Sequence, residues 1–519
     1  MQPIDFDIRE KVLNDLGNIV ISASAGTGKT HTTIERIKAD ISRCNNYQTF
    51  AAITFTNKAS KEIQNRLGPN KGSGFVGTND NFILSEIIQP FMYDVYGEEC
   101  KGDIKPDYST ENQIKSSVEG IERIKTTLTM CKAFNQKRNF PFILALDILT
   151  KSDSARKYLM SKYYRIYIDE YQDSDVDMHR LFLFLCDDLK IPLFIVGDVK
   201  QSIYGWRGTD KEGFISLFTK DGFTKYELRH NFRSNIQIQN YSNVFIEDVR
   251  HYYQNVELKN EVQLFEYSSE DRAIEFIKSW VDMKKSCAML IYQNAQAERW
   301  SNILKANGLD FSHIPSSPLD NSNLESEHIW IAREISKYNY RSSYSEYDFM
   351  DEIVTPEAYK VTEIRKHLED IVSKKGNKAE LKESYTEFLI YQGYDECTPN
   401  LNQTIDTLFN VLNDDKYFNT YNQDLFKQVV TTIHSAKGLE YKQIIIFADN
   451  YNFQDDDNRF LHYVAVTRPE EKLLILCNGK YSFNNYMREI NNAIGETKKL
   501  DIEIEVDDII KIMNDAWVY

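Results

Sequence analysis

The stretch that decides the fold runs from Ile21 to Thr30 and reads ISASAGTGKT. It overlaps an apolar run from Asn18 to Ser22, which predicts a short buried strand. Gly26 and Gly28 allow backbone N–H groups to converge on phosphate oxygens, and we expect a helix to begin at about Gly28. The sequence therefore predicts a phosphate-binding loop between a strand and a helix.

Two side chains at the end of this loop have the chemistry that a bound nucleotide requires. Lys29 would neutralise charge on the β- and γ-phosphates, and the hydroxyl of Thr30 would bind Mg²⁺. The first motif position is Ala23 where the strict pattern has glycine, so the motif alone is also compatible with an ordinary turn. We expect the nucleotide to contact Ala23, Ser24, Ala25, Gly26, Thr27, Gly28, Lys29 and Thr30.

A second apolar strand, from Tyr164 to Ile168, ends in a pair of carboxylates. Asp169 would hold the metal ion, and Glu170 would polarise the attacking water. The alternative is an exposed acidic strand end, which the nearby phosphate-binding motif makes the weaker interpretation. Together, the loop and the carboxylate pair predict hydrolysis of a nucleoside triphosphate.

Length, composition and charge are consistent with a large globular protein. The chain has 519 residues, which at roughly 150 residues per domain corresponds to three or four structural units. Its hydrophobic content of 42% is sufficient to fill their cores. The net charge of −16 disfavours indiscriminate binding to nucleic acid, so any such contact must use a local basic groove.

Cysteine usage and the amino terminus bear on the compartment. The seven cysteines form no CxxC pair, and their odd number argues against a disulfide framework or a zinc site. The initial stretch MQPIDFDIRE is acidic and lacks the apolar core of a signal peptide. No run approaches the roughly 18 apolar residues that a membrane span needs. We therefore expect a cytoplasmic protein.

Strands that lead into polar loops and helical segments recur along the chain, with two interruptions. One doubly wound parallel sheet is predicted from strands that end at Ser22, Phe55, Asp169 and Gly197. A second α/β unit is predicted from strand candidates at 287–292, 429–433, 443–448 and 472–477. Each unit would place its ligand loops at the carboxyl ends of its strands.

The interruptions are predicted to be helical. The first contains EGIERIKTTLTMCKAF at 119–134, which has helical apolar spacing and no convincing strand signal. The second, at 316–424, is polar and tyrosine-rich and has apolar residues at helical intervals. The predicted division is 1–85 and 151–225 for the first α/β unit, 86–150 for its insertion, 226–315 and 425–519 for the second unit, and 316–424 for its insertion.

A series of motifs in a fixed order resembles the UvrD/Rep/PcrA helicases of superfamily one. After the phosphate-binding loop come IYIDEYQDSD at 166–175, VGDVKQSIYGWRG at 196–208, TTIHSAKGLEY at 431–441 and VAVTR at 464–468. In that family, two RecA-like (P-loop) doubly wound domains bind ATP between them, and inserted subdomains stand above a groove for single-stranded DNA. The resemblance implies this α/β fold, DNA-dependent hydrolysis of ATP or dATP, and Mg²⁺ as the metal.

The resemblance also assigns residues to the nucleotide. Gln201 resembles the residue that senses the γ-phosphate, and Phe232 in ELRHNFRS at 227–234 resembles the aromatic that stacks on adenine. Arg233 and Arg468 would reach the phosphates from the second domain; an ordinary ion pair is the alternative for each arginine. Glu440 would contact the ribose. Gly438 would allow a close approach of the backbone.

Further positions are implied as DNA contacts. AITFTNKASKEIQNRL at 52–67 resembles the single-strand-binding segment of the family, while Tyr204 and Trp206 resemble aromatics that stack on bases without reading sequence. The alternatives are that Phe55 and Trp206 are core residues and that His434 is a structural histidine. The implied set is Phe55, Asn57, Lys58, Tyr204, Trp206, Arg207, His434 and Lys437.

The chain also departs from the family pattern. Only Gln2 precedes the phosphate-binding loop, and it lies too far upstream to match the adenine-reading glutamine, so selectivity for adenine stays open. The usual TFHS block reads GTNDNF at 77–82, with Asp80 in place of a histidine. The insertion at 316–424 is shorter than in full-length family helicases. Processive unwinding is therefore a weaker expectation than ATP hydrolysis.

Less common segments resemble the UvrD-like subunits of Gabija anti-phage defence systems. These are GTNDNFILSEIIQPF at 77–91, FPFILALDILTKS at 140–152 and SKYYRIYIDEYQDSDVDMHRLF at 161–182. The resemblance implies a GajA-like OLD-family partner with a Toprim nuclease domain, and activation by DNA ends or single strands. A stand-alone 3′-to-5′ repair or replication helicase, and a scaffold that binds nucleotide without turnover, are the alternatives.

Overall fold

The computed structural model describes residues 2–44, 47–106, 113–133, 135, 138–203, 208–257, 259–320, 327–353, 361–393 and 401–513. Within these ranges, only the backbone is described for Asn57, Lys58, Asp320, Glu327 and Asp351. No helix in the described ranges has both the length and the apolar character needed to cross a membrane.

The first α/β domain is built on a six-stranded sheet whose strands all run parallel. The strand order is β10-β1-β9-β8-β2-β3. The strands are β1 (Asn18–Ala23), β2 (Thr49–Thr54), β3 (Phe75–Thr78), β8 (Tyr163–Ile168), β9 (Leu193–Gly197) and β10 (Phe223–Leu228). Its helices are α1 (Phe6–Asn14), α2 (Lys29–Ile41), α3 (Asn57–Leu67), α9 (Val176–Asp187) and α10 (Lys211–Ser216). The predicted doubly wound sheet is confirmed, and the predicted boundary after residue 225 lies inside β10.

The first insertion lies between β3 and β8 and is mostly helical. Its helices are α4 (Asn79–Ile83), the π-helix Leu84–Ile88, α5 (Gln89–Tyr96), α6 (Ser117–Thr127), α7 (Phe140–Lys151) and α8 (Asp153–Lys162). The helix predicted through residue 134 is wrong beyond Thr127, because Leu128 adopts a left-handed conformation with φ of 52°. The residues that follow form short parallel pairs, with the strands β4 (Lys105–Pro106), β5 (Gln113–Ile114), β6 (Thr129–Met130) and β7 (Lys132–Ala133).

The second α/β domain has a seven-stranded parallel sheet with the order β13-β14-β12-β15-β16-β11-β17. Its strands are β11 (Val262–Tyr267), β12 (Cys287–Ile291), β13 (Ser312–His313), β14 (Gln428–Thr432), β15 (Tyr441–Phe447), β16 (Pro469–Asn478) and β17 (Lys511–Met513). The central strands β12 and β14 are buried along their whole length, because helices cover both faces of the sheet. The helices are α11 (Ile236–Val244), α12 (Glu270–Trp280), α13 (Asn294–Ala306), α20 (Asp456–Val466), α21 (Gly479–Lys498) and α22 (Val506–Ile509).

The second insertion lies between β13 and β14 and packs around a core of its own. The helices predicted for it are confirmed in the described residues as α14 (Glu327–Tyr340), α15 (Glu346–Glu352), α16 (Val361–Ser373), α17 (Lys378–Tyr391), α18 (Leu401–Leu412) and α19 (Lys416–Tyr421). Lys61 of α3 forms an ion pair with Glu352, and Lys105 of the first insertion donates to the carbonyl of Gly393. The second insertion therefore contacts both the first domain and the first insertion.

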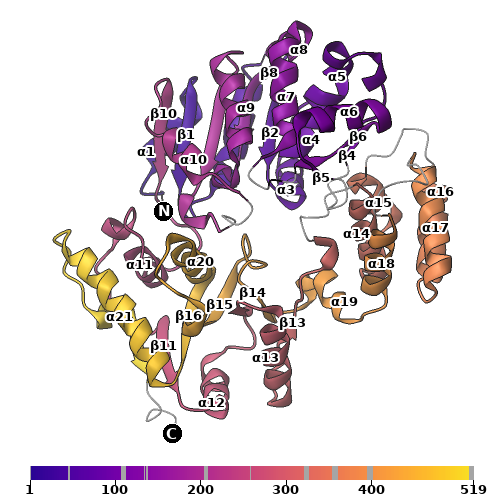
Figure 1. Cartoon of the computed structure of the whole chain (residues 1–519). Helices are drawn as coiled ribbons and strands as arrows, with labels where there is room; N and C mark the ends of the chain where they lie inside the picture. Colours follow the sequence, from indigo (N-terminus) through magenta and orange to yellow (C-terminus); the bar gives the residue numbers. More distant parts are fainter. Residues whose placement is uncertain are drawn as a thin grey trace.

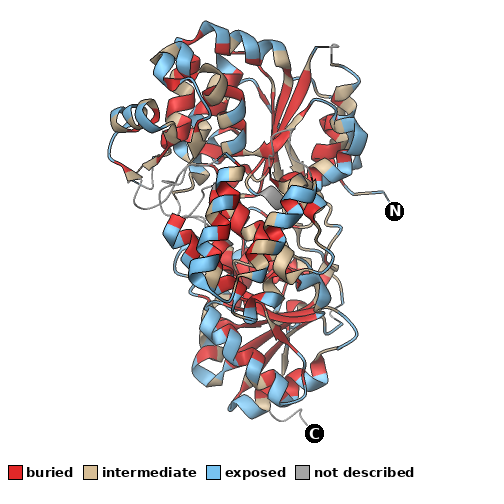
Figure 2. Cartoon of the chain, turned by 90° about the vertical axis from the view of Figure 1, so that its right-hand side faces the viewer, coloured by how far each residue is buried: buried red, intermediate tan, exposed pale blue. Residues whose placement is uncertain are grey.

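The two sheets lie one above the other, and the second insertion stands to one side of them (Figure 1). In the view turned by 90°, buried strands lie near the top and near the bottom of the chain, and helices with buried residues of their own stand in front of the boundary between the two domains (Figure 2). The carboxyl ends of β1 and β8 carry the motifs quoted above, and they face this boundary. The fold thus brings residues of both domains to one place.

Candidate nucleotide site and nucleic-acid groove

A cavity of about 740 Å³ lies between the two α/β domains. The first domain contributes the phosphate-binding loop and the end of β8, and the second contributes the segments around Phe232, Lys437 and Arg468. At its other end the cavity reaches the first insertion. Its lining includes Ser24, Gly26, Lys29, Thr30, Phe55, Arg66, Lys132, Arg138, Asp169, Glu170, Gln201, Phe232, Arg233, Lys437, Glu440 and Arg468.

The phosphate-binding loop has the conformation that its glycines permit. Gly26 and Gly28 have φ of 75° and 78°, and Gly28 caps the amino end of α2. A Cβ atom on Gly26 would lie 2.4 Å from Oδ1 of Asn231, so the loop also needs glycine because another segment approaches it closely. Ala23 is the buried last residue of β1 and does not line the cavity. The predicted strand, loop and helix are confirmed.

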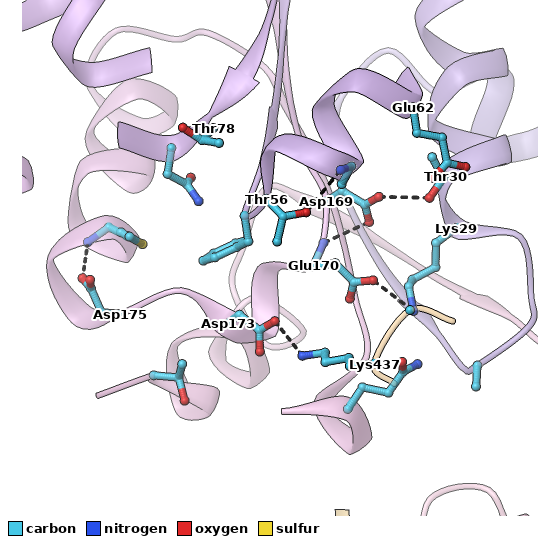
Figure 3. Close-up of a pocket in the computed structure, with 18 of the residues that line it drawn as sticks. Lys29, Thr30, Thr56, Glu62, Thr78, Asp169, Glu170, Asp173, Asp175 and Lys437 are labelled. Atoms are coloured by element: carbon cyan, nitrogen blue, oxygen red, sulfur yellow. Dashed lines mark hydrogen bonds and ion pairs between the residues drawn. The ribbon is translucent and has the colours of Figure 1, made fainter. Parts of the chain in front are cut away.

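The four side chains expected to handle phosphate and metal lie together (Figure 3). Lys29 Nζ is 3.7 Å from Glu170 Oε1, and the Thr30 hydroxyl donates to Asp169 Oδ2 at 3.3 Å. Glu170 has a positive φ of 54°, which is strained for a non-glycine residue, and Gln172 Nε2 donates to its carboxylate at 2.6 Å. This geometry aims the Glu170 carboxylate at the lysine.

Burial and the neighbouring charge of Glu170 raise the pKa of Asp169 to about 7. For Glu170, burial acts against ionisation, but Lys29 and Lys437 lower the pKa below its ordinary value. Two close carboxylates repel each other, and a divalent cation beside Asp169 and Thr30 would relieve that repulsion. The donor set suits Mg²⁺, which usually takes one or two protein oxygens and completes its shell with phosphates and water.

An ion pair joins the two domains at the edge of this group. Lys437 Nζ lies 2.8 Å from Asp173 Oδ2, as Figure 3 shows. Burial raises the pKa of Asp173 although Lys437 stands beside it. Lys437, which the sequence predicted as a DNA contact, thus lines the cavity with its amine directed to a first-domain carboxylate. Its contact with DNA stays a prediction.

The predicted sensor and both predicted arginines line the cavity. Gln201 Nε2 donates to Asp198 Oδ2 at 2.7 Å, and Arg468 Nη2 lies 3.4 Å from Gln201 Oε1. Arg233 forms an ion pair with Glu440 and donates to the carbonyl of Thr467 at 3.3 Å. Burial and the charge of Arg233 lower the pKa of Arg468 to about 9. A phosphate between the two arginines would offset their mutual repulsion.

The expected base and ribose positions lie on the second-domain side. Phe232 is 57% exposed, lines the cavity, and donates its backbone N–H to the carbonyl of Gly26 at 2.8 Å. Gly438 has φ of 80° with open space beside it, and Glu440 pairs with Arg233. Phe232 therefore keeps exposed surface for stacking on a base, while its ring also contacts Arg9 and His230.

Sequence reasoning missed Asp5 and Arg9 of α1. The Arg9 guanidinium lies 5.1 Å from the centre of the Phe232 ring and donates to the Thr27 carbonyl at 2.9 Å. Asp5 accepts from Arg9 Nε at 2.8 Å and from the backbone N–H of Arg229 at 2.7 Å. An acid and a base four residues apart on the helix before the loop were the available signal.

The structure places only part of the predicted nucleic-acid set. Phe55 lines the cavity, and the ring of His434 lies 6.2 Å from that of Tyr292, which is 49% exposed. The side chains of Asn57 and Lys58 and the whole of Tyr204, Trp206 and Arg207 lie outside the described residues. The cavity residues Arg66, Lys132 and Arg138 were not predicted, because only the fold brings them together, and Tyr292 beside His434 was not predicted either.

Two family models match the chain. That of the UvrD/REP helicase N-terminal domain matches residues 5–79 and 103–222. That of the UvrD-like helicase C-terminal domain matches residues 427–476. The matched segments include the phosphate-binding loop, the carboxylate pair, Gln201 and Arg468.

Individual proteins are similar over most of the chain. The Gabija protein GajB of Bacillus cereus (strain VD045) is 38% identical, with 91% of this chain and 96% of that protein covered. The ATP-dependent DNA helicase PcrA of Staphylococcus epidermidis and that of Staphylococcus aureus (strain Mu50) are each 22% identical, with 90% of this chain and 82% of the relative covered.

Proposed function

Because the chain belongs to the family of GajB and, more broadly, to the UvrD-like helicases, we propose that it is a DNA-dependent NTPase of a Gabija-type anti-phage defence complex. The substrate is ATP or dATP with Mg²⁺. The observation that carries this proposal is the cavity in which Lys29, Thr30, Asp169 and Glu170 of one domain face Arg233 and Arg468 of the other.

The residues divide the work of hydrolysis. Lys29 and the loop backbone hold the phosphates, and Glu170 orients the attacking water and takes its proton. Mg²⁺, when bound beside Thr30 and Asp169, would supply charge to the β- and γ-phosphate oxygens. Arg233 and Arg468 stabilise charge that develops during phosphoryl transfer, so turnover requires the two domains to be closed.

Nucleic acid is proposed to enter the part of the cavity that faces the first insertion. Arg66, Lys132 and Arg138 line that part together with the carboxylates Glu62, Asp80 and Asp175, and Phe55 supplies an aromatic face. Because the whole chain carries a net charge of −16, phosphate contacts in this part of the cavity would depend on these three basic side chains. The proposed trigger is a DNA end or a single strand.

The proposed partner is a GajA-like OLD-family nuclease with a Toprim domain. The first insertion, predicted as residues 86–150, is the proposed docking element, while the second insertion, at 316–424, gates access to DNA. The alternative is a stand-alone 3′-to-5′ helicase. The chain is 38% identical to GajB but only 22% identical to PcrA, the latter over 90% of the chain. The defence role is therefore better supported than the stand-alone helicase.

The decisive experiment measures NTP hydrolysis with and without single-stranded DNA, and with and without the neighbouring nuclease. We expect stimulation by DNA and co-elution with the nuclease in size-exclusion chromatography. Robust unwinding of tailed duplexes by the chain alone, without co-elution, would favour the stand-alone helicase. An absence of nucleotide hydrolysis under all four conditions would favour the scaffold.

A further inference from the structure

Lys200 is a buried cation at the boundary of the two domains. It follows β9 in the short helix Val199–Gln201 and is 4% exposed. Its Nζ lies 2.6 Å from Asp198 Oδ1 and 6.0 Å from the centre of the Tyr463 ring on α20. It does not line the cavity. Lys200 therefore acts on the reaction only through other residues.

Lys200 keeps its positive charge in this buried position. Burial alone would lower the pKa of Lys200, but Asp198, Tyr463 and Asp248 outweigh it and raise the pKa above its ordinary value. Asp248 follows α11 and Tyr463 lies on α20, so both belong to the second domain. The cation is thus shared between a first-domain carboxylate and second-domain groups.

Asp198 divides its two oxygens between Lys200 and Gln201. Oδ1 forms the ion pair with Lys200, and Oδ2 accepts a hydrogen bond from Gln201 Nε2 at 2.7 Å. A carboxylate can only accept hydrogen bonds, so the amino group of Gln201 must face Asp198. Its carbonyl Oε1 is then left to face Arg468 Nη2, 3.4 Å away. The lysine, the aspartate and the glutamine form one chain that ends at the arginine.

Removal of the lysine would leave Asp198 as a fully buried carboxylate without its cation. Such a charge is costly and attracts the nearest mobile cation. Arg468 is already within reach of Gln201, and its other hydrogen bonds are to the carbonyls of Val464 and Leu439 and to the hydroxyl of Thr467. Arg468 would turn toward Asp198 and away from the phosphates.

We propose that Lys200 is a positioning residue for hydrolysis: by neutralising Asp198 it fixes the amide of Gln201 and keeps Arg468 available to the γ-phosphate. This inference rests on the proposed nucleotide hydrolysis. It adds a residue that touches neither nucleotide nor metal. Tyr463, on the helix that leads to Arg468, ties the same lysine to the second domain, so domain closure and the orientation of Gln201 are linked.

The test compares Lys200→Met, Lys200→Arg and the double variant Lys200→Met with Asp198→Asn in DNA-stimulated hydrolysis. We expect Lys200→Met to lower kcat by about tenfold or more with KM nearly unchanged. Arginine at 200 should retain most of the activity. The double variant should recover much of the loss, because no buried charge then remains unpaired. Lys211→Met is the matched control: Lys211 also pairs across the boundary, 3.2 Å from Asp456, but is more exposed.

A second readout separates positioning from a general loss of structure. Binding of ADP with aluminium fluoride, which mimics the transferring phosphoryl group, should weaken in Lys200→Met while binding of a non-hydrolysable ATP analogue is retained. A normal kcat in Lys200→Met, or equal losses with both ligands alongside a lower melting temperature, would overturn the proposal. If the unchanged protein and Lys29→Ala both fail to bind nucleotide, the proposed function itself is wrong and this inference falls with it.

Discussion

Lys437 of the second domain lies 2.8 Å from Asp173 of the first, and their side chains are 12% and 8% exposed. The pair therefore connects the loop that follows β14 to the turn that follows Asp169 and Glu170. Because burial raises the pKa of Asp173 even with its partner present, loss of the lysine would leave an unfavourable charge or force its protonation. The ion pair thus stabilises a direct contact between the two domains.

A double-mutant cycle with Lys437→Met and Asp173→Asn should show a coupling energy of about 1 kcal/mol or more in urea unfolding. Buried partners are expected to couple strongly, since each single change leaves the other group unpaired. The more exposed boundary pair Lys211 and Asp456 should give a value near zero. Equal coupling in the two cycles would show that the Lys437 contact is not maintained in solution.

Mg²⁺ affinity should depend on pH near neutrality. The raised pKa of Asp169, about 7, means that its carboxyl group is increasingly protonated as the pH falls below that value. A metal ion requires the deprotonated form, so affinity should fall by about tenfold per pH unit on the acid side. Mg²⁺ titrations of nucleotide binding between about pH 5.5 and pH 8 would measure this. Asp169→Asn should bind Mg²⁺ weakly and lose this steep dependence; a wild-type profile without a slope contradicts the prediction.

Lys29→Ala and Glu170→Gln should fail at different steps. The first removes the cation that holds the phosphates, so nucleotide binding or turnover should be abolished. The second keeps the shape of the side chain but removes the base, so nucleotide should still bind while hydrolysis stops. Nucleotide binding and phosphate release measured on the same samples would distinguish the two. Near-normal turnover by Glu170→Gln would show that the carboxylate pair is assigned wrongly.

Gly26→Ala should disrupt both nucleotide binding and the fit between domains. The new methyl group would lie 2.4 Å from Asn231 Oδ1 and 2.9 Å from Arg233 Cβ, in a backbone conformation that alanine rarely adopts. We expect a stability loss of about 1–3 kcal/mol and a large increase in KM. Gly222→Ala is the control, because its φ of 83° is similar and open space surrounds it. Gly222→Ala should lower the stability of the protein without raising KM.

Phe232→Ala should raise KM for the nucleotide by about tenfold, because the base loses its stacking surface. Phe232→Tyr should retain most of the affinity. Tyr481→Ala removes another exposed aromatic, 82% accessible on α21, and should leave KM unchanged. Titration with a fluorescent nucleotide would compare the three variants. Equal affinities in all of them would mean that Phe232 does not contact the base.

Local patterns predicted the strand, loop and helix around the phosphate-binding motif, and tertiary contacts account for what was missed. The phosphate-binding loop and the Asp169–Glu170 pair are continuous segments, so strand, turn and charge could be read directly from the sequence. Asp5 and Arg9 could not be connected to Phe232 in this way, because that contact joins positions 223 residues apart in the chain. The same holds for the basic residues Arg66 and Lys132, which come from separate elements.

Most of the elements that were predicted wrongly or missed are short or at sheet edges; the exception is β11, a six-residue strand between β16 and β17 that was not predicted. The helix expected through residue 134 ends at Thr127, where Leu128 adopts a left-handed conformation. This end could not be predicted, because the residue in that conformation is a leucine and not a glycine. The edge strands β13 and β17 have two and three residues, too few for a periodic pattern to be recognised. Both gain their pairing from a sheet formed by distant segments.

The hydrogen bond between the Phe232 N–H and the Gly26 carbonyl uses no side-chain atom. Any residue except proline at position 232 can donate this hydrogen bond, so the connection between the two domains does not depend on which side chain stands there. A change of the side chain at this position can therefore alter the lining of the cavity while the backbone connection between the domains is retained.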